Sequence, residues 1–335
     1  MAGDPTGRPS ARTAIVLAAK MAISVALFAW LFHTVKWAAV ATAIGRANPA
    51  WLFAAFALLI TSNVLGSYQW SRLLRAVGID LPLWKVVAYY HVGLFFNNFL
   101  PANVGGDFAR ILDASRAGSS RTAAFSTVML DRMIGTIALG GLAVLTTLPA
   151  ITHFHLAAAY AGILGFFTLA VVTMWAVFHP ALLATLERLL AKVGLARLKP
   201  ALDDLSEQLA GFRGRRRMFL ELFTVATCVQ VMRIGVHVLV ARALGLSVPI
   251  AYFFLFVPLL AVIVSLPISL NGIGVRESAG MLLFGMVGLS KSDAFALQFT
   301  TYLVAVAVSL IGGVVFLVRI PHRRAADRVS RRPTE

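Results

Sequence analysis

Residues 95–110 read FFNNFLPANVGGDFAR, which places polar and helix-breaking residues directly after an apolar run. A second stretch, residues 265–278, reads SLPISLNGIGVRES. Both contain Leu-Pro, a short spacer, Asn, two Gly and Arg, in that order. Proline lacks the N–H that a helix needs and clashes with the preceding turn, while glycine permits unusual backbone angles and close approach. The two stretches therefore predict helices that break at two places.

The chain as a whole is strongly apolar. Of its 335 residues, 59% are hydrophobic and 13% are charged, which leaves too little polar surface for a soluble protein of this size. Windows long enough to cross a bilayer lie near residues 14–34, 50–70, 122–148, 156–178, 217–240 and 294–319. Two shorter apolar runs, 86–100 and 251–266, end at the two broken stretches. The sequence thus predicts an all-α polytopic membrane protein with about six full spans.

The basic residues predict the orientation of the chain, because Lys and Arg concentrate in cytoplasmic loops. With the N-terminus inside, 23 basic residues fall in inside segments and 4 in outside segments. The remaining three, Arg132, Arg233 and Arg276, fall at membrane depth. Topology therefore accounts for the net charge of +16, and no nucleic-acid partner is expected. We expect a multi-pass protein of the cytoplasmic (inner) membrane with both termini in the cytoplasm.

The same count predicts that the two broken stretches are re-entrant hairpins. The loops on both sides of the first stretch face the cytoplasm, and those on both sides of the second face outside, so the hairpins oppose each other. Non-helical backbone at membrane depth is tolerated only against protein or a water-filled cavity. The residues expected to shape the hairpins are Pro101, Gly105, Gly106, Pro267, Gly272 and Gly274.

A helix, a hairpin and a helix follow one another twice in one membrane domain, about 50–148 and about 217–319. Because the two units start on opposite sides, they predict an inverted repeat; chance recurrence of Leu-Pro and Gly pairs is the alternative. Residues 179–216 have leucines at helical spacing and predict an amphipathic cytoplasmic connector, with a purely structural role as the simpler interpretation. The polar residues 320–335 predict a basic, disordered tail.

Charged side chains at membrane depth are costly and usually face a cavity or a bundle interior. Asp131 and Arg132 are adjacent, so on a helix they point in different directions and each needs another partner. Arg233 and His237 are four residues apart and share a helix face. Four arginines accompany three carboxylates, and the surplus cation suits an anionic ligand that Arg can hold bidentately. The alternative is that all these charges form structural salt bridges.

Polar residues near the breaks complete the predicted site. Asn side chains there would bind a polar headgroup, or only cap helix ends, which is the simpler interpretation for Asn103 and Asn271. The residues predicted to bind substrate are Asn97, Asn98, Asn103, Asp107, Arg110, Asp131, Arg132, Arg233, His237, Asn271, Arg276 and Glu277. A weaker idea is a proton relay between His237 and Asp131 or Glu277.

No motif for catalysis is evident. The chain has one cysteine, Cys228, and no paired-His metal spacing, nucleophile elbow or nucleotide-binding loop. We therefore expect no enzymatic activity, no catalytic residue, no metal and no cofactor. Two other classes stay open: a membrane transferase on a lipid-linked substrate that uses Asp107 or Asp131 with a metal, and a non-transporting partner of a lipid-synthesis enzyme.

Three segments together, NNFLPANVGGDFAR, TVMLDRMIG and LPISLNGIGVRES, resemble the lysylphosphatidylglycerol synthase transmembrane family, also called flippase-like or UPF0104 proteins. The resemblance covers about 14–320. In bifunctional members the membrane part flips an aminoacylated lipid, and a separate C-terminal soluble domain makes that lipid. This chain ends at Glu335 without such a domain, so the resemblance implies lipid translocation and argues against aminoacyl transfer.

Residues and resemblance point to the same function. We expect the protein to bind an anionic or amphipathic membrane lipid and to move it between leaflets. The headgroup would enter a polar cavity between the hairpin tips, lined by Arg132, Arg233 and Arg276, while the acyl chains stay in the bilayer. One repeat would move against the other to alternate access.

Overall fold

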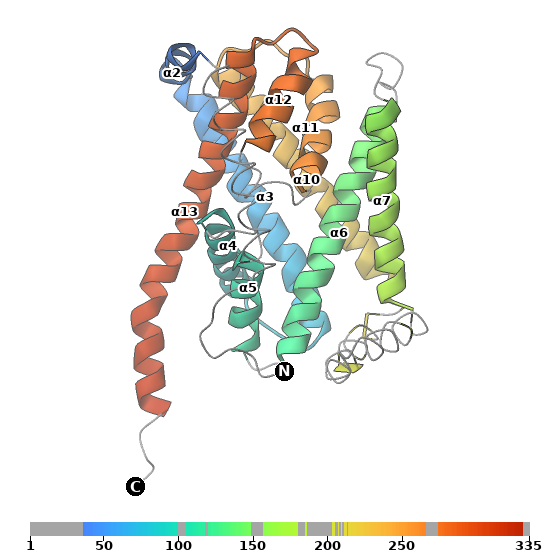
Figure 1. Ribbon diagram of the computed structural model, residues 1–335. Coiled ribbons are helices and arrows are strands. Elements are labelled where there is room, and N and C mark those ends of the chain that lie inside the picture. Colours follow the sequence, from blue (N-terminus) through green and yellow to red (C-terminus); the bar gives the residue numbers. More distant parts are fainter. Residues whose placement is uncertain are drawn as a thin grey trace, which may run out of the picture.

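The structure, a computed structural model, is a helical bundle (Figure 1). It describes residues 36–99, 105–117, 120–148, 157–179, 214–265 and 274–330, with single residues between 185 and 212. No strand occurs among these residues. The first predicted span, 14–34, lies outside them.

Among the described residues, four helices are long and apolar enough to cross a membrane. They are α3 (Pro49–Ala76), α6 (Arg121–Thr147), α10 (Arg216–Ala243) and the Lys291–Arg319 part of α13 (Lys291–Ser330). The apolar helix α7 (Ala157–Val177) packs against α6. These five helices follow five of the predicted spans, and the protein is an all-α, multi-pass membrane protein, as its composition predicted.

Five shorter helices complete the described fold. They are α2 (Trp37–Gly45), α4 (Leu83–Phe99), α5 (Gly105–Ser115), α11 (Ile250–Ser265) and α12 (Val275–Gly285). The pairs α4–α5 and α11–α12 occupy opposite halves of the bundle, lower and upper in Figure 1. Each pair therefore consists of two separate helices, one before and one after a predicted break. The linking residues, which include Pro101, Asn103, Pro267, Asn271 and Gly272, lie outside the described residues.

Local sequence signals explain where two of the long helices begin. Asn48 precedes α3, and its Oδ1 accepts a hydrogen bond from the Ala50 N–H at 2.9 Å, while Pro49 occupies the first helical position. Ser120 precedes α6, and its Oγ accepts from the Ala123 N–H at 3.0 Å. These caps satisfy N–H groups that have no partner within the helix.

The bundle has an apolar surface, and polar residues are buried among the apolar residues of its interior. The polar residues of α3 that are buried inside are Ser62, Asn63, Ser67, Gln69 and Ser71. Large apolar side chains face outward instead, among them Phe53, Leu145, Leu220 and Val314. An apolar surface with polar groups turned inward fits a bundle that is surrounded by lipid.

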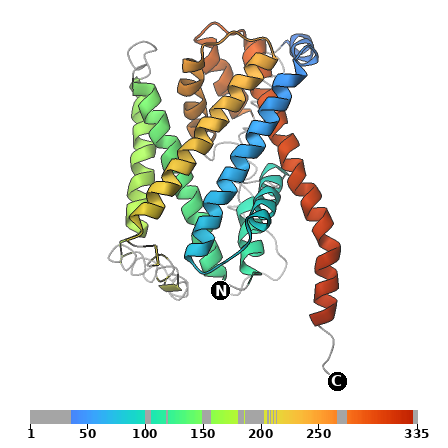
Figure 2. The same cartoon turned by 180° about the vertical axis from the view of Figure 1, so that it is seen from behind.

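Each helix contact that the first predicted unit makes, internally or with the second unit, has a counterpart made by the second unit. α3 packs against α10, and the two run side by side in Figure 2. α4 contacts α13 of the other unit, and α11 likewise contacts α6. Within each unit, α5 contacts α6 and α12 contacts α13. These reciprocal contacts support the predicted inverted repeat.

The structure describes parts of both predicted polar segments, the tail and the connector. Disorder was predicted from residue 320, but α13 continues to Ser330, so the prediction is wrong over residues 320–330. Extending an existing helix costs much less than nucleating one, which composition alone does not register. Most of the connector 179–216 lies outside the described residues. Its end is anchored in the bundle, because Leu209 and Phe212 are fully buried against α3, α6 and α10.

Candidate functional site

Two polar cavities adjoin in the interior of the bundle. Cavity 1 has a volume of about 220 Å³ and cavity 2 of about 380 Å³. Leu94, Asn97 and Arg233 line both, so the cavities meet where α4 faces α10. The other polar residues of cavity 1 include Gln69, Tyr90, Arg110, Asp131, Arg132 and Gln230. Those of cavity 2 include Asn63, Asn98, His237, Arg276, Thr301, Tyr302 and Ser309.

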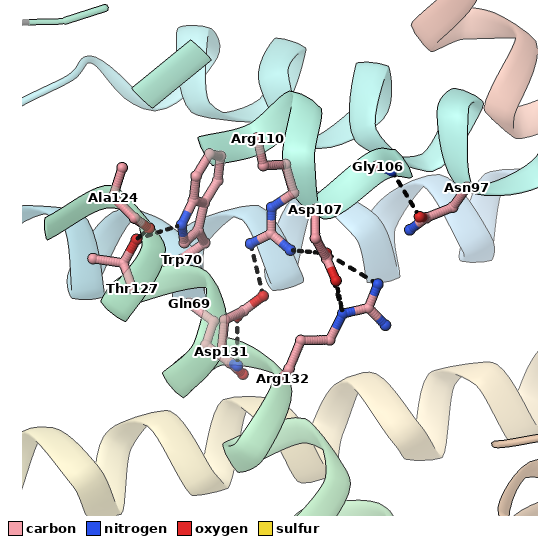
Figure 3. A network of polar contacts seen from close by, with 10 residues as sticks. All are labelled: Gln69, Trp70, Asn97, Gly106, Asp107, Arg110, Ala124, Thr127, Asp131 and Arg132. Atoms are coloured by element: carbon pink, nitrogen blue, oxygen red, sulfur yellow. Dashed lines mark hydrogen bonds and ion pairs between the residues drawn. The ribbon is translucent and has the colours of Figure 1, made fainter. Parts of the chain in front are cut away.

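A buried ion pair forms the centre of cavity 1 (Figure 3). Arg110 of α5 donates from Nη2 to Asp131 Oδ2 of α6 at 2.7 Å, and both side chains are buried. Gln69 of α3 donates from Nε2 to the other oxygen, Oδ1, at 2.9 Å. Three helices thus converge on one carboxylate, whose negative charge a cation and an amide both stabilise.

Two aromatic rings enclose the Arg110 guanidinium. Its Cζ lies 4.2 Å from the ring centroid of Trp70 and 4.7 Å from that of Tyr90. Trp70 is fixed in turn, because its Nε1 donates to Thr127 Oγ1 at 3.1 Å. The rings stabilise the cation and restrict its movement. Arg110 is therefore held rigidly, which favours a positioning role over direct exchange with a ligand.

A second ion pair in cavity 1 is more accessible. Asp107, in the first turn of α5, accepts from Arg132 Nε at 2.9 Å through Oδ2 and from Nη2 at 3.0 Å through Oδ1. Asp107 also lies 3.8 Å from Arg110 Nη1. The Arg132 side chain is 51% exposed, compared with 6% for Arg110. Of these two cations, Arg132 is the one that a ligand can reach without unpacking the core.

The half-helices α5 and α12 are both capped by polar side chains. Asn97, near the end of α4, accepts from the Gly106 N–H through Oδ1 at 2.9 Å. A Cβ at Gly106 would overlap the Gly93 carbonyl oxygen, so only glycine fits this approach. In α12, Glu277 Oε2 accepts from the Gly274 N–H at 2.8 Å, and Gly274 has a φ of 81°. Asn97 and Glu277 therefore have a structural role in this conformation.

Cavity 2 is cationic. Arg233 of α10 and Arg276 of α12 line it together with His237, and no carboxylate lines it within the part of the chain that the structure describes. The Arg276 Cζ lies 4.9 Å from the ring centroid of Tyr302. His237 Nδ1 lies 3.0 Å from the backbone oxygen of Arg233. Arg233 forms no ion pair with any described residue. An anion entering here would meet at least two guanidinium groups.

The predicted residues separate into groups. Asp131 and Arg132 do not pair with each other, and each has a partner on α5, as their adjacency required. Arg132, Arg233 and Arg276 were expected in one cavity but divide between two, with Arg233 in both. The described contacts do not join His237 to Asp131 or Glu277. Asn98 lines cavity 2, whereas Asn103 and Asn271 lie outside the described residues.

Sequence reasoning missed several residues of the site: Asn63, Gln69, Trp70, Tyr90, Thr301 and Tyr302. For Asn63 and Gln69 a signal existed, because an amide within an apolar span is itself uncommon. The aromatic residues gave no such signal, since Trp and Tyr are also common at membrane interfaces.

Comparison with known proteins agrees with this architecture. The family model of the lysylphosphatidylglycerol synthase TM region matches residues 17–313. A UPF0104 membrane protein of Methanothermobacter thermautotrophicus is 30% identical over 148 residues, which are 44% of this chain and 43% of that protein. The alignment thus spans less than half the length of this relative. The family match covers most of the chain, including the helix pairs α4–α5 and α11–α12, three of the four long spans and most of the fourth. The chain belongs to the lysylphosphatidylglycerol synthase TM region family.

Proposed function

We propose that the protein binds the headgroup of an anionic or amphipathic membrane lipid in the adjoining cavities and moves it between leaflets. The family name, which refers to a lipid synthase, supports a lipid-related membrane function. The acyl chains would stay in the bilayer, beside the apolar outer surface. We also propose that the protein lies in the inner membrane with cytoplasmic termini, and that it transports rather than catalyses.

The position of Arg233 is the main support for this proposal. Its side chain lines both cavities and has no ion pair among the described residues, although it lies within a long membrane-crossing helix. An uncompensated cation at such a depth is costly. A lipid phosphate would supply the missing charge, and the planar guanidinium suits it. Because Arg233 lines both cavities, it can contact a headgroup in either one.

The hairpins supply a plausible physical route. The α4–α5 and α11–α12 hairpins approach the interior from opposite halves of the bundle, and their ends contribute Asn97 and Arg276 to the cavities. In inverted-repeat transporters, rocking of one repeat against the other exposes a central site alternately. The reciprocal contacts of α4 with α13 and of α11 with α6 would couple such a movement between the units.

A reconstituted system tests this function. Purified protein is placed in vesicles that contain a trace of fluorescent phosphatidylglycerol, and a membrane-impermeant reductant then bleaches the outer leaflet. Translocation by wild-type protein bleaches more than the half accessible in protein-free vesicles. We expect Arg233→Gln to slow this loss at least tenfold. Arg75→Gln is the matched control, because Arg75 forms an exposed ion pair with Asp80 at 3.4 Å, away from both cavities.

Failure has a defined form. If wild-type and empty vesicles bleach to the same extent with phosphatidylglycerol, phosphatidylethanolamine and aminoacylated phosphatidylglycerol in turn, the proposed transport is wrong for these lipids. Recovery of a chemically altered lipid from the same vesicles would favour a transferase instead. Equal slowing by Arg75→Gln and Arg233→Gln would show that the effect is not specific to the cavities.

A further inference from the structure

The two cavities correspond to each other through the helices that line them. α3 and α10 are both 28 residues long and start 167 residues apart, at Pro49 and Arg216. Ser62 Oγ donates to the Val229 oxygen at 3.4 Å, and this contact joins positions that are themselves 167 residues apart. Equivalent positions therefore meet at the crossing of α3 and α10, as expected at a two-fold axis that relates two repeats.

The linings follow the same relationship. α6 and α13 start at Arg121 and Lys291, 170 residues apart. Nine residues of α3, α10 and α13 line cavity 2, and eight of them have a counterpart at these spacings in the lining of cavity 1. The matched pairs, with the residue of cavity 2 first, are Leu59 and Ala226, Asn63 and Gln230, Arg233 and Gly66, Val236 and Gln69, Thr301 and Asp131, Tyr302 and Arg132, Ala305 and Gly135, and Ser309 and Leu139. The linings of the two cavities thus correspond to each other as two copies of one site would.

The return half-helices add the matching arginines. Arg110 and Arg276 each follow the proline of their hairpin by nine residues. Each lines its own cavity and lies against an aromatic ring, Tyr90 for Arg110 and Tyr302 for Arg276. Arg110 is the sixth residue of α5 and Arg276 is the second residue of α12. The difference of four positions is about one helical turn, so the two arginines lie on corresponding faces of their helices.

The copies differ in charge. Cavity 1 is lined by three arginines, and carboxylates bind two of them: Asp131 of the lining binds Arg110, and Asp107 beside the cavity binds Arg132, while Arg233 is the third. In cavity 2, the counterpart of Asp131 is Thr301, and no described carboxylate lines the cavity. Cavity 2 therefore lacks the carboxylate that cavity 1 has at this position. Its volume of about 380 Å³ also lies in the usual range of ligand pockets, whereas the 220 Å³ of cavity 1 does not.

We infer that cavity 2 is a phosphate-binding site, held by Arg233 and Arg276, and that cavity 1 is a copy of it in which carboxylates neutralise two of the three arginines. The inference rests on the proposed function only in taking a membrane lipid as the source of the phosphate. A lipid phosphodiester and free phosphate share the chemistry that two guanidinium groups recognise. Among the matched positions, Thr301 is the one at which cavity 1 has a carboxylate, Asp131.

Exchange of that position provides the test. Thr301→Asp places a carboxylate where cavity 1 has Asp131, so it should neutralise Arg276 and weaken phosphate binding. Thr301→Asn is the matched control, because Asn has nearly the same size as Asp but carries no charge. The binding of dihexanoyl phosphatidylglycerol to detergent-purified full-length protein is measured by calorimetry. Dihexanoylglycerol, which lacks the phosphate, and inorganic phosphate are the comparison ligands.

We expect Thr301→Asp to weaken phosphatidylglycerol binding at least tenfold more than Thr301→Asn. Arg276→Gln should weaken it by roughly 10- to 150-fold, the loss of one charge-assisted hydrogen-bonding group. This loss should exceed that of Arg132→Gln by at least tenfold. Melting temperatures of all variants, measured without lipid, identify those that fold. If inorganic phosphate binds equally well with the same pattern of losses, the phosphate site stands and its source is free phosphate.

Two results would overturn the inference. One is a folded Thr301→Asp variant that binds phosphatidylglycerol like wild type. The other is a larger loss from Arg132→Gln than from Arg276→Gln, which would place the phosphate in cavity 1. Since the assay measures equilibrium binding, absent transport with this binding pattern intact would reject the proposed translocation and leave the phosphate site in place.

Discussion

Arg110 Nη2 and Asp131 Oδ2 lie 2.7 Å apart in the buried centre of cavity 1 and join α5 to α6. The Trp70 and Tyr90 rings lie within 5 Å of the Arg110 guanidinium, at 4.2 and 4.7 Å, so the cation has little freedom to leave. This pair fixes the return half of the first hairpin to a membrane-crossing helix. We expect this buried pair to contribute more to the stability of the folded protein than the more exposed pair of Arg132 and Asp107.

Asp131→Asn should destabilise the folded protein strongly. It leaves the Arg110 charge buried without its main partner, and loss of one member of a buried pair typically costs about 3–5 kcal/mol. The midpoint of thermal unfolding in detergent should therefore fall. The double variant Asp131→Asn with Arg110→Gln should recover part of the loss, because no buried charge remains. An unchanged melting temperature for Asp131→Asn would show that the pair is unimportant for stability.

Arg132→Gln should behave differently in the same assay. Its side chain is half exposed in the cavity, where exposed ion pairs contribute about 1 kcal/mol or less. Thermal unfolding should change little, although Asp107 loses its bidentate partner. A loss as large as that of Asp131→Asn would contradict the distinction between a fixed and an accessible cation in cavity 1.

Gly106→Ala should disrupt the first hairpin. The added Cβ would overlap the Gly93 carbonyl oxygen and lie 2.5 Å from Asn97 Cγ, so the hairpin must open or shift. We expect lower melting temperature and weaker lipid binding. Gly162→Ala in α7 is the control, because a Cβ there meets nothing within 4 Å, and alanine favours a helix. Normal melting and binding for Gly106→Ala would mean that this approach is not required.

The re-entrant course of the hairpins can be tested by labelling with a membrane-impermeant thiol reagent. In a Cys228→Ser background, cysteines at Gly78 and Ser120 bracket the first hairpin, and cysteines at Ser247 and Ser290 bracket the second. We expect Gly78 and Ser120 to be labelled only from the cytoplasmic side, and Ser247 and Ser290 only from the other side. Labelling of Gly78 and Ser120 from opposite sides would turn α4–α5 into a full crossing.

Much of this fold was predictable because membrane helices have a length requirement that the sequence shows directly. The windows 122–148 and 156–178 correspond almost residue for residue to α6 and α7. Leu-Pro and glycine pairs indicated where helices break, since their effect on the backbone is local. The extension of α13 to Ser330 was missed, because polar composition does not show that a long helix can continue.

The site was predictable only in part. Charges at membrane depth marked Asp131, Arg132, Arg233 and Arg276 as interior residues, because their cost in lipid is independent of the fold. Their partners depended on contacts between distant helices: Arg110 of α5 meets Asp131 of α6, and Arg276 of α12 meets the Tyr302 ring of α13. No short-range pattern encodes such pairs. The division into two cavities follows from the same long-range packing.

The most direct test of the account is an experimental structure of the full chain in nanodiscs that contain phosphatidylglycerol. The account predicts a lipid headgroup in cavity 2, with its phosphate oxygens about 3 Å from the guanidinium groups of Arg233 and Arg276, and with its acyl chains outside the bundle. The Asp131–Arg110 pair in cavity 1 should remain closed. A headgroup bound only in cavity 1, or ordered lipid only at the outer surface while both cavities hold water alone, would contradict it.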